Sequence, residues 1–469
     1  MNENMDTAAA MPTKQFFVSM LTRDISLDDA ILDLVDNCLD GALRCSNGSE
    51  VDYSKHWVKI NLTHESFLIE DNCGGIPRNV AKDYAFKMGR DHDDDRDSED
   101  ETIGMYGVGM KRAIFKMGRE SIVKTRFEED SFEVPISATW LDNKEWNPLP
   151  IVDTEKVNVL AEPGTTIRVH ELNPSVARLF TNGAFVNDLH TSIAEHFTMF
   201  LQRGLLVTIN GKPVEPIRVE VLVSERAEGP SPYVYEKIIE GVKVSITVGL
   251  NTPNGVSSDD DDTPDFEKDR SSATSGWTVF CNDRAVIVGD KSRLTGWGLI
   301  LPRYHAQYSI ITGIVEFRSK KAESLPVTTT KRALDVSSDV WLQILNKMRD
   351  GMRIWIDYTN EWKNHPRSDQ TVHWKDAKPA SLREVVALAS KRESAVKNGV
   401  VEFNPKKHNA VPTPETKLPT SRRITFSRPV DEIRLISKAL FDTEDQKPSN
   451  VGETCFEMIL KDLEQGGRE

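Results

Sequence analysis

The chain has 469 residues, which is enough for roughly three domains of about 150 residues each. Hydrophobic residues make up 38% of it and charged residues 28%, a balance that excludes wholesale disorder, a fibrous repeat and a small disulfide scaffold. The net charge of -14 argues against a surface that coats DNA throughout, although residues 91–101 (eight acids, one arginine) and 259–270 (seven acids, two basic residues) carry most of it.

Membrane and secretion signals are not visible in the sequence. No stretch approaches the roughly 18 apolar residues of a membrane helix, and residues 1–14 lack the apolar core of a signal peptide. We therefore expect a cytoplasmic protein without membrane contact. An odd number of cysteines without a C-x-x-C pair argues against a zinc site or a disulfide framework and predicts reduced, partly buried thiols at Cys38, Cys45, Cys73, Cys281 and Cys455.

The first predicted element is an amphipathic helix over residues 25–44. Apolar residues occupy one half of its circumference, and Asp33, Asp36, Asn37 and Asp40 fall on a narrow opposite arc. The simplest interpretation is that this arc is the solvent-exposed face. The alternative is that Asp33, Asn37 and Asp40 together hold a hydrated cation, because Mg²⁺ prefers a few protein oxygens supplemented by phosphates and water.

Two strands are predicted next, over residues 57–62 and 67–69. The second runs into a glycine turn, with Asp71 at its end and Gly75 inside the turn. Such an aspartate either opens the turn for structural reasons or accepts a hydrogen bond from the exocyclic amine of a base. Both interpretations remain open at this stage.

The sequence Phe-Lys-Met-Gly-Arg occurs twice, at residues 86–90 and 115–119. Each copy predicts a helix end at which Gly89 or Gly118 adopts a left-handed conformation. The pair is too short to indicate a repeat architecture.

A glycine-rich loop, residues 103–111, follows the acidic segment and leads into a helix that begins near Met110. Backbone N–H groups at such a helix start can bind phosphate oxygens, and Lys111 would add a positive charge. An ordinary flexible loop with a solvent-exposed lysine is the competing interpretation. A Walker A loop is excluded because Arg112 follows the lysine, and a Rossmann fingerprint fits poorly because no strand directly precedes the glycines.

A β-rich region with few helices follows. Gly164 and Thr165 open a strand, and Asn210-Gly211 predicts a hairpin turn. The acidic run 259–270 is interpreted as a solvated insertion. The remaining predicted elements are strands over 243–249, 277–281 and 310–317, a helix over 337–362, a loosely ordered stretch over 364–429 and a closing helix over 451–463.

The order of these features resembles the four nucleotide-binding motifs of the GHKL ATPases, the superfamily of gyrase-type topoisomerases, large heat-shock chaperones, histidine kinases, MutL and MORC proteins. The pattern looks closest to MORC-like and MutL-like prokaryotic ATP-binding proteins. The matching segments are Asp33-Leu-Val-Asp-Asn37-Cys-Leu-Asp40-Gly-Ala42, Asp71-Asn-Cys-Gly-Gly75, Gly104-Met-Tyr-Gly107-Val-Gly109-Met-Lys111 and Gly164-Thr165.

The resemblance implies an α+β fold: a Bergerat-type ATPase sandwich, that is a mixed sheet with helices on one face, over residues 1–180 with a lid at about 89–110. A transducer-like β-α-β domain would follow over 181–345, with the acidic insertion 259–270 inside it. A smaller C-terminal α/β region, helical and basic, would complete the chain over 346–469.

The resemblance also implies a site for ATP and Mg²⁺. Asn37 would bind the metal, Asp71 would accept the adenine amino group, Gly75 would line the base pocket and Thr165 would support it through water. The phosphates would be held, as the lid closes, by Gly104, Gly107, Val108, Gly109, Met110 and Lys111.

Beyond the ATPase motifs, residues 276–286 resemble a transducer strand with a small polar turn. Residues 325–335 resemble the loop whose lysine, here Lys331, reaches the terminal phosphate; an ordinary loop lysine is the alternative. Histidine kinases lack this domain, and no phospho-acceptor helix precedes Asp33, so a kinase is disfavoured.

Two positions depart from the family pattern. Asp33, four residues before Asn37, stands where most hydrolysing members have Glu. The aspartate side chain is shorter than that glutamate by one methylene. Because a general base must lie within about 2.6–3.2 Å of its proton donor, we expect slow hydrolysis. Cys73 stands where a glycine is usual, which affects how closely adenine packs.

The expected function is an ATPase switch that forms a homodimer on ATP and acts on DNA or in a multi-protein, DNA-related anti-phage defence system. Residues 361–428 carry 14 Lys/Arg against 7 Asp/Glu with Trp362, His373 and Trp374 interleaved, a composition that suits contact with nucleic acid or a solvated linker. The alternative is a nucleotide-sensing interaction module that recruits a separate effector without contacting nucleic acid.

Overall fold

The computed structural model describes residues 12–46, 50–89, 101–104, 107–154, 159–224, 231–251, 274–328, 331–393, 411–414 and 424–466. The chain divides into two compact units, Met1–Pro414 and Glu415–Glu469, each of which is described by itself. The acidic segment up to residue 100 and the acidic insertion 259–270 lie outside the described residues.

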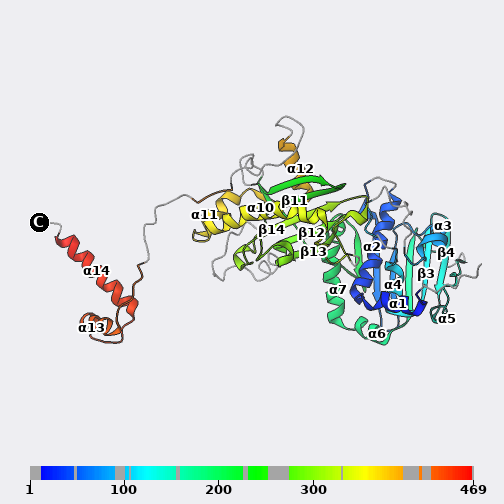
Figure 1. Cartoon of the computed structure of the whole chain (residues 1–469), viewed down its shortest axis with the longest axis horizontal. Coiled ribbons are helices and arrows are strands. Elements are labelled where there is room, and N and C mark those ends of the chain that lie inside the picture. The colour runs from blue at the N-terminus through cyan, green and yellow to red at the C-terminus, as the bar shows by residue number, and fades with distance from the viewer. Residues whose placement is uncertain are drawn as a thin grey trace, which may run out of the picture. The chain divides into compact units, whose positions relative to one another are not determined.

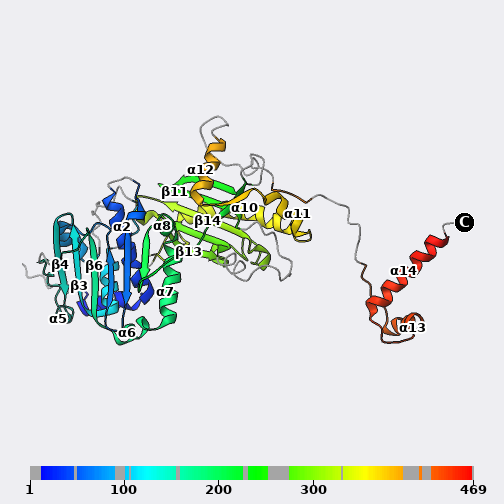
Figure 2. The ribbon, with the colours of Figure 1, turned by 180° about the vertical axis from the view of Figure 1, so that it is seen from behind.

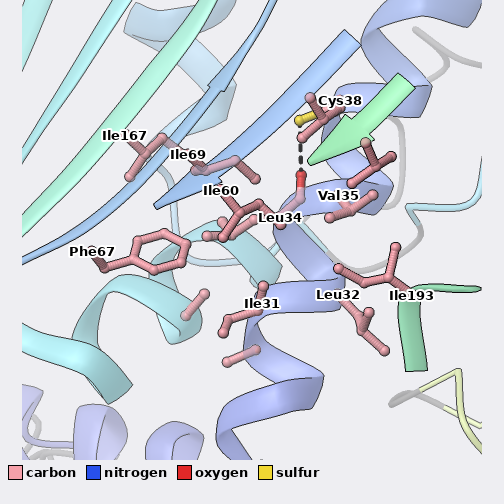
Figure 3. Packing of buried hydrophobic residues seen from close by; sticks show 14 of the residues in the cluster. Ile31, Leu32, Leu34, Val35, Cys38, Ile60, Phe67, Ile69, Ile167 and Ile193 are labelled. Atoms are coloured by element: carbon pink, nitrogen blue, oxygen red, sulfur yellow. Dashed lines mark hydrogen bonds between the residues drawn. The ribbon is translucent and has the colours of Figure 1, made fainter. Parts of the chain in front are cut away.

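Helix α2 (Leu27–Cys45) is the central helix of the first layer and confirms the helix expected over residues 25–44. Ser26 caps its N-terminus, and the Ser26 hydroxyl accepts the N–H of Asp29 at 3.2 Å. Its apolar half is removed from water, and Figure 3 shows Ile31 and Leu34 facing Phe67 across the core. The apolar periodicity of the sequence is therefore the contact between helix and sheet.

An eight-stranded mixed sheet lies against this helix. The pair β1–β7 is parallel and the other neighbouring pairs are antiparallel. Figure 1 shows α1, α2 and α4 gathered against the sheet, and Figure 2 shows β3, β4 and β6 side by side from behind. The sheet order is β5 (Val152–Asp153), β4 (Asp130–Ile136), β3 (Gly118–Phe127), β6 (Gly164–Leu172), β2 (Phe67–Asp71), β1 (Trp57–Leu62), β7 (Leu206–Ile209) and β8 (Lys212–Pro213).

The helices of this layer confirm the expected sandwich of a mixed sheet and helices. Because β7 pairs with β1, the sheet continues past residue 180 to Pro213. The expected hairpin turn joins β7 to β8, and both of its residues, Asn210 and Gly211, have positive φ. The helices are α1 (Lys14–Arg23), α2, α3 (Arg78–Val80), the π-helical turn η2 (Ala81–Ala85), α4 (Gly109–Met117), α5 (Ala138–Asp142), α6 (Pro174–Phe180), α7 (Gly183–His196) and α8 (Thr198–Gln202).

The second copy of the repeated pentapeptide differs from its prediction. Gly118 is not left-handed, because φ is -164° and the residue begins β3. A Cβ atom there would lie 2.6 Å from the carbonyl oxygen of His170, so the glycine serves the close approach of two strands. Gly89 has the predicted positive φ of 99°.

A second sheet of five strands follows, with β12 parallel to β14 and the other pairs antiparallel. Helix α10 (Asp339–Trp362) packs on β11 and β14 through a buried stripe that includes Trp341, Met348 and Trp355. The three strands and the helix predicted here are confirmed. The sheet order is β10 (Tyr233–Ile239), β11 (Val242–Leu250), β14 (Ile311–Arg318), β12 (Gly276–Cys281) and β13 (Arg284–Asp290).

The segment after α10 is more ordered than the sequence predicted. It forms α11 (Arg367–Thr371), β15 (Ala377–Ala380) and α12 (Leu382–Glu393), and β15 pairs with β9 (Val221–Ser224). The expectation of a loose stretch was wrong for these residues. The reason is that Trp374, which is 2% exposed, packs against Trp355 and Tyr358 of α10. The many lysines around it in the sequence gave no sign of this burial.

The second unit contains α13 (Val430–Phe441) and α14 (Pro448–Gly466), and α14 confirms the closing helix. None of the described helices is both long enough and apolar enough to cross a bilayer. All five cysteines are free thiols, and Cys38, Cys73 and Cys281 are buried.

Candidate functional site

The expected site residues converge on one cavity of about 1560 Å³. It lies between α2, the glycine turn after β2, the start of α4, the start of β6 and the loop before α10. Every site residue expected from the sequence lines it: Asp33, Asn37, Asp71, Gly75, Gly104, Gly107, Val108, Gly109, Met110, Lys111, Thr165 and Lys331.

Asp71 forms the polar centre of one end of this cavity. One carboxylate oxygen accepts the N–H groups of Cys73 (2.8 Å) and Thr165 (3.3 Å), and the other accepts the thiol of Cys38 at 3.4 Å. Burial raises the pKa of Asp71 to about 6, although these donors partly offset the effect. Above that pH the carboxylate is ionised and can accept a hydrogen bond from an amine.

Backbone packing shapes the wall beside Asp71. Gly75 has φ of 75°, and a Cβ atom there would lie 2.0 Å from the carbonyl oxygen of Arg126, so this position requires glycine. The Thr165 hydroxyl lies 3.3 Å from that of Thr125, which also accepts the N–H of Ile76 at 2.8 Å. The wall is therefore held by hydrogen bonds between neighbouring strands and the turn.

The polar arc of α2 differs from both interpretations of the sequence. Asp33, Asp36 and Asp40 are 4%, 0% and 2% exposed, and only Asn37 of the four is exposed. The carboxylate of Asp40 accepts the N–H groups of Ile103 and Gly104, each at 2.8 Å. The acids thus form neither a solvated face nor a three-ligand cation site, because their carboxylates already accept hydrogen bonds from other groups of the protein.

A metal ion at this site would depend on Asn37 and on the bound substrate. Within the part of the chain that the structure describes, no group of three His, Cys, Asp or Glu side chains is placed to hold a metal. Asn37 lines the cavity and offers an amide oxygen. This donor set fits Mg²⁺ that takes its other ligands from phosphates and water.

Asp33 is held by Arg112, a residue that sequence reasoning used only to exclude a Walker A loop. The Nε and Nη2 atoms of Arg112 lie 2.7 and 2.6 Å from Oδ2 of Asp33, whereas Oδ1 lies 4.0 Å from Nζ of Lys331. Burial raises the pKa of Asp33, and Lys331 and Arg112 only partly counteract it. The carboxyl is therefore more basic than an exposed aspartate.

Lys331 lies in the segment between β14 and α10 and contacts the same helix, α2. Its Nζ lies 2.9 Å from Oδ2 of Asp36, while Nε of Arg284 lies 2.8 Å from Oδ1. Burial alone would raise the pKa of Asp36, but Arg284 and Lys331 outweigh it and hold the pKa below its usual range. Sequence reasoning missed Asp36 and Arg284, and the only signal was the position of Asp36 on the polar arc.

Lys111 is buried at the start of α4, and its ammonium group bonds the cavity wall. It donates to the carbonyl oxygens of Ala85, at 2.9 Å, and Gly107. The lysine therefore joins the end of the glycine-rich loop to η2. The N-terminus of α4 opens on the same cavity through Gly109 and Met110.

Residues 25–167 match the family model described as "Histidine kinase-, DNA gyrase B-, and HSP90-like ATPase". This span contains every expected site residue except Lys331. No curated protein matches the chain.

The raised pKa of Asp71 predicts a pH dependence of adenine nucleotide binding. The ionised carboxylate is a much stronger acceptor for a hydrogen bond from the adenine amino group than the protonated acid is. Affinity should therefore be constant above pH 7 and fall toward tenfold per pH unit below about 6. Titration with a fluorescent adenine nucleotide between pH 5 and 8 measures this. The Asp71→Asn variant should bind the nucleotide more weakly at pH 8, and its affinity should no longer fall near pH 6. A parent affinity that does not change with pH would contradict the role of Asp71.

Proposed function

Residues 25–167 belong to the GHKL superfamily of ATP-binding domains, and on this premise we propose that the protein is an ATP-dependent molecular switch that hydrolyses ATP slowly. The observation that carries the proposal is the single cavity that joins Asp71, Asn37 and the start of α4 to Lys331. A cavity that includes a residue from beyond the matched span links nucleotide binding to the second sheet.

In the proposed complex, the adenine amino group donates to Asp71, while Gly75 forms the wall and Thr165 acts through water. The phosphates lie at the N-terminus of α4, whose N–H groups and dipole favour anions. Asn37 supplies a ligand to Mg²⁺, which neutralises phosphate charge. Lys331 contributes the positive charge at the terminal phosphate.

For hydrolysis, we propose that Asp33 orients the attacking water and accepts its proton. The raised pKa of its carboxyl favours this role. Two features support slow turnover: the aspartate is shorter than the usual glutamate, and Arg112 engages Oδ2. A shift of about 1 Å in a reacting group can lower a rate roughly 10²-fold.

Substitution of Asp33 tests the chemical role. Asp33→Ala should lower kcat by about 10²-fold, the size of a general-base contribution, and change ATP affinity little, because Asp33 does not bind the base. Phosphate release and nucleotide binding are measured for the same preparations, with exposed Asp52→Ala as the matched control. If Asp33→Ala is unaffected and Asp33→Glu is no faster than the parent, Asp33 has no part in the mechanism.

We propose that closure over ATP also joins two copies of the chain through their N-terminal segments. The exposed faces of Phe16 (59%) and Met20 (41%) on α1 support this, since apolar side chains on a terminal helix favour burial against a partner. Hydrolysis would then release the pair.

Particle mass tests the proposed dimerisation. A non-hydrolysable ATP analogue with Mg²⁺ should double the mass measured by light scattering, and ADP should not. Asn37→Ala should remain monomeric with the analogue, because metal binding is impaired. A parent that stays monomeric at saturating analogue would exclude ATP-dependent dimerisation.

We propose DNA, or an assembly in DNA-related defence, as the target of the switch. The support is the basic excess over residues 361–428. Trp362 and Trp374 are buried, so these two aromatic side chains are not available for the contact with nucleic acid that the composition suggested. The contact would instead be between exposed lysines such as Lys363 and Lys375 and the phosphate backbone.

A second candidate is a nucleotide sensor that recruits a protein effector. The observation that favours it lies in the second unit, where α13 and α14 expose large apolar side chains at helical spacing. The most exposed are Leu435 (73%), Leu463 (68%), Val430 (62%) and Ile459 (59%).

Salt dependence of DNA binding separates the two targets. Contact through the lysines predicts that affinity falls steeply with salt, and that Lys363→Glu with Lys375→Glu weakens binding more than tenfold. Exposed Lys237→Glu on the second sheet is the control for overall charge. Fluorescence anisotropy with duplex and single-stranded DNA measures it, and absence of binding even at low salt would favour the protein effector.

A further inference from the structure

We propose that Arg284 is a positioning residue: it takes over the charge of Asp36, so that Lys331 can leave this carboxylate for the terminal phosphate of ATP. This inference rests on the proposed function. It concerns how the site distinguishes ATP from ADP.

The five charged groups involved form a buried series of alternating sign. Arg112 bonds Asp33, Lys331 lies 4.0 Å from Asp33 and 2.9 Å from Asp36, and Arg284 bonds Asp36 on its far oxygen. Three cations thus face two carboxylates.

Asp36 needs a partner that does not move. Its side chain is 0% exposed, so water cannot solvate it when Lys331 departs. A buried carboxylate that loses its counter-charge is strongly disfavoured. Because Arg284 holds Oδ1 while Lys331 holds Oδ2, the carboxylate keeps one charged partner after the lysine moves.

Arg284 also holds the backbone of Lys331. Its Nη1 donates to the Lys331 carbonyl oxygen at 2.7 Å, and Lys331 has the left-handed φ of 57°. A non-glycine residue keeps this conformation only when its surroundings impose it. The exchange of partners is therefore confined to the lysine side chain, whose stem is flexible.

The position of Arg284 itself is imposed by the hairpin between β12 and β13. Asn282 and Asp283 make its turn with positive φ, and the Asn282 amide donates to the carbonyl oxygens of Ser319 (2.9 Å) and Thr102 (3.0 Å). The guanidinium lies 5.4 Å from the ring of Phe197. Arginine suits this place because it stays charged and offers several donors in a fixed plane.

The consequence is a preference for ATP. With ADP there is no terminal phosphate, and Lys331 stays on Asp36. Without Arg284, departure of the lysine would leave Asp36 unpaired, so ATP binding should suffer and ADP binding should not. Removing the charge of Asp36 as well should relieve the defect.

The test compares affinities for a non-hydrolysable ATP analogue and for ADP, with Mg²⁺, in the full chain. Arg284→Gln should lower the affinity for the analogue about tenfold or more and leave ADP within about twofold. The double variant Arg284→Gln with Asp36→Asn should recover most of the lost preference. Exposed Arg293→Gln on the same region is the matched control and should behave as the parent.

Melting temperature is recorded for each variant to separate positioning from folding. If Arg284→Gln does not fold, Arg284→Met, which is similar in length and also removes the charge, carries the same comparison. If the parent binds both nucleotides and Arg284→Gln loses the same affinity for each, or keeps the parent's ratio of the two affinities, the inference is overturned but the proposed function is not. A parent that binds neither nucleotide would overturn the proposed function and the inference with it.

Discussion

The burial of three carboxylates on one helix is the constraint on which the rest of the first unit depends. Asp33, Asp36 and Asp40 of α2 are removed from water, and each is satisfied by a different part of the chain. Arg112 on α4 pairs with the first, Arg284 and Lys331 with the second, and the N–H groups of residues 103–104 with the third. Removing one partner of a buried pair costs about 3–5 kcal/mol, whereas the net contribution of an intact pair is small. The network therefore specifies an arrangement more than it adds stability.

That arrangement brings the end of the expected lid into contact with the second sheet. Thr102 accepts the Asn282 amide, and Glu101 pairs with Arg318, which also pairs with Asp283. The same hairpin that carries Arg284 to Asp36 thus contacts the lid end. A movement of the lid would change these bonds and so act on the β12–β13 hairpin. This gives the proposed switch a physical connection between the nucleotide and the second sheet.

Asp71 in the cavity wall and the fully buried Asp36 show how the surroundings of two carboxylates suit them to different tasks. Asp71 has only neutral donors around it, and burial raises its pKa to about 6. Asp36 is equally buried but has two cations, which hold its pKa below the usual range. The first group is suited to recognition that depends on pH, and the second to a permanent charge that a movable lysine can leave and rejoin.

The sequence by itself determined the α2 helix, the strands over residues 57–62, 67–69, 243–249, 277–281 and 310–317, the hairpin at Asn210 and the candidate residues of the cavity. Periodicity, glycine turns and motif order are local properties, which is why they could be read from the sequence. It did not reveal that Asp36 is buried, since an aspartate on the polar arc of a helix is normally solvated. Only the tertiary structure decided this, by bringing Arg284 from 248 residues away to the carboxylate. The same holds for Trp362 and Trp374, which the sequence suggested were available for contact but which are buried in a core. Burial depends on partners that the local sequence does not contain.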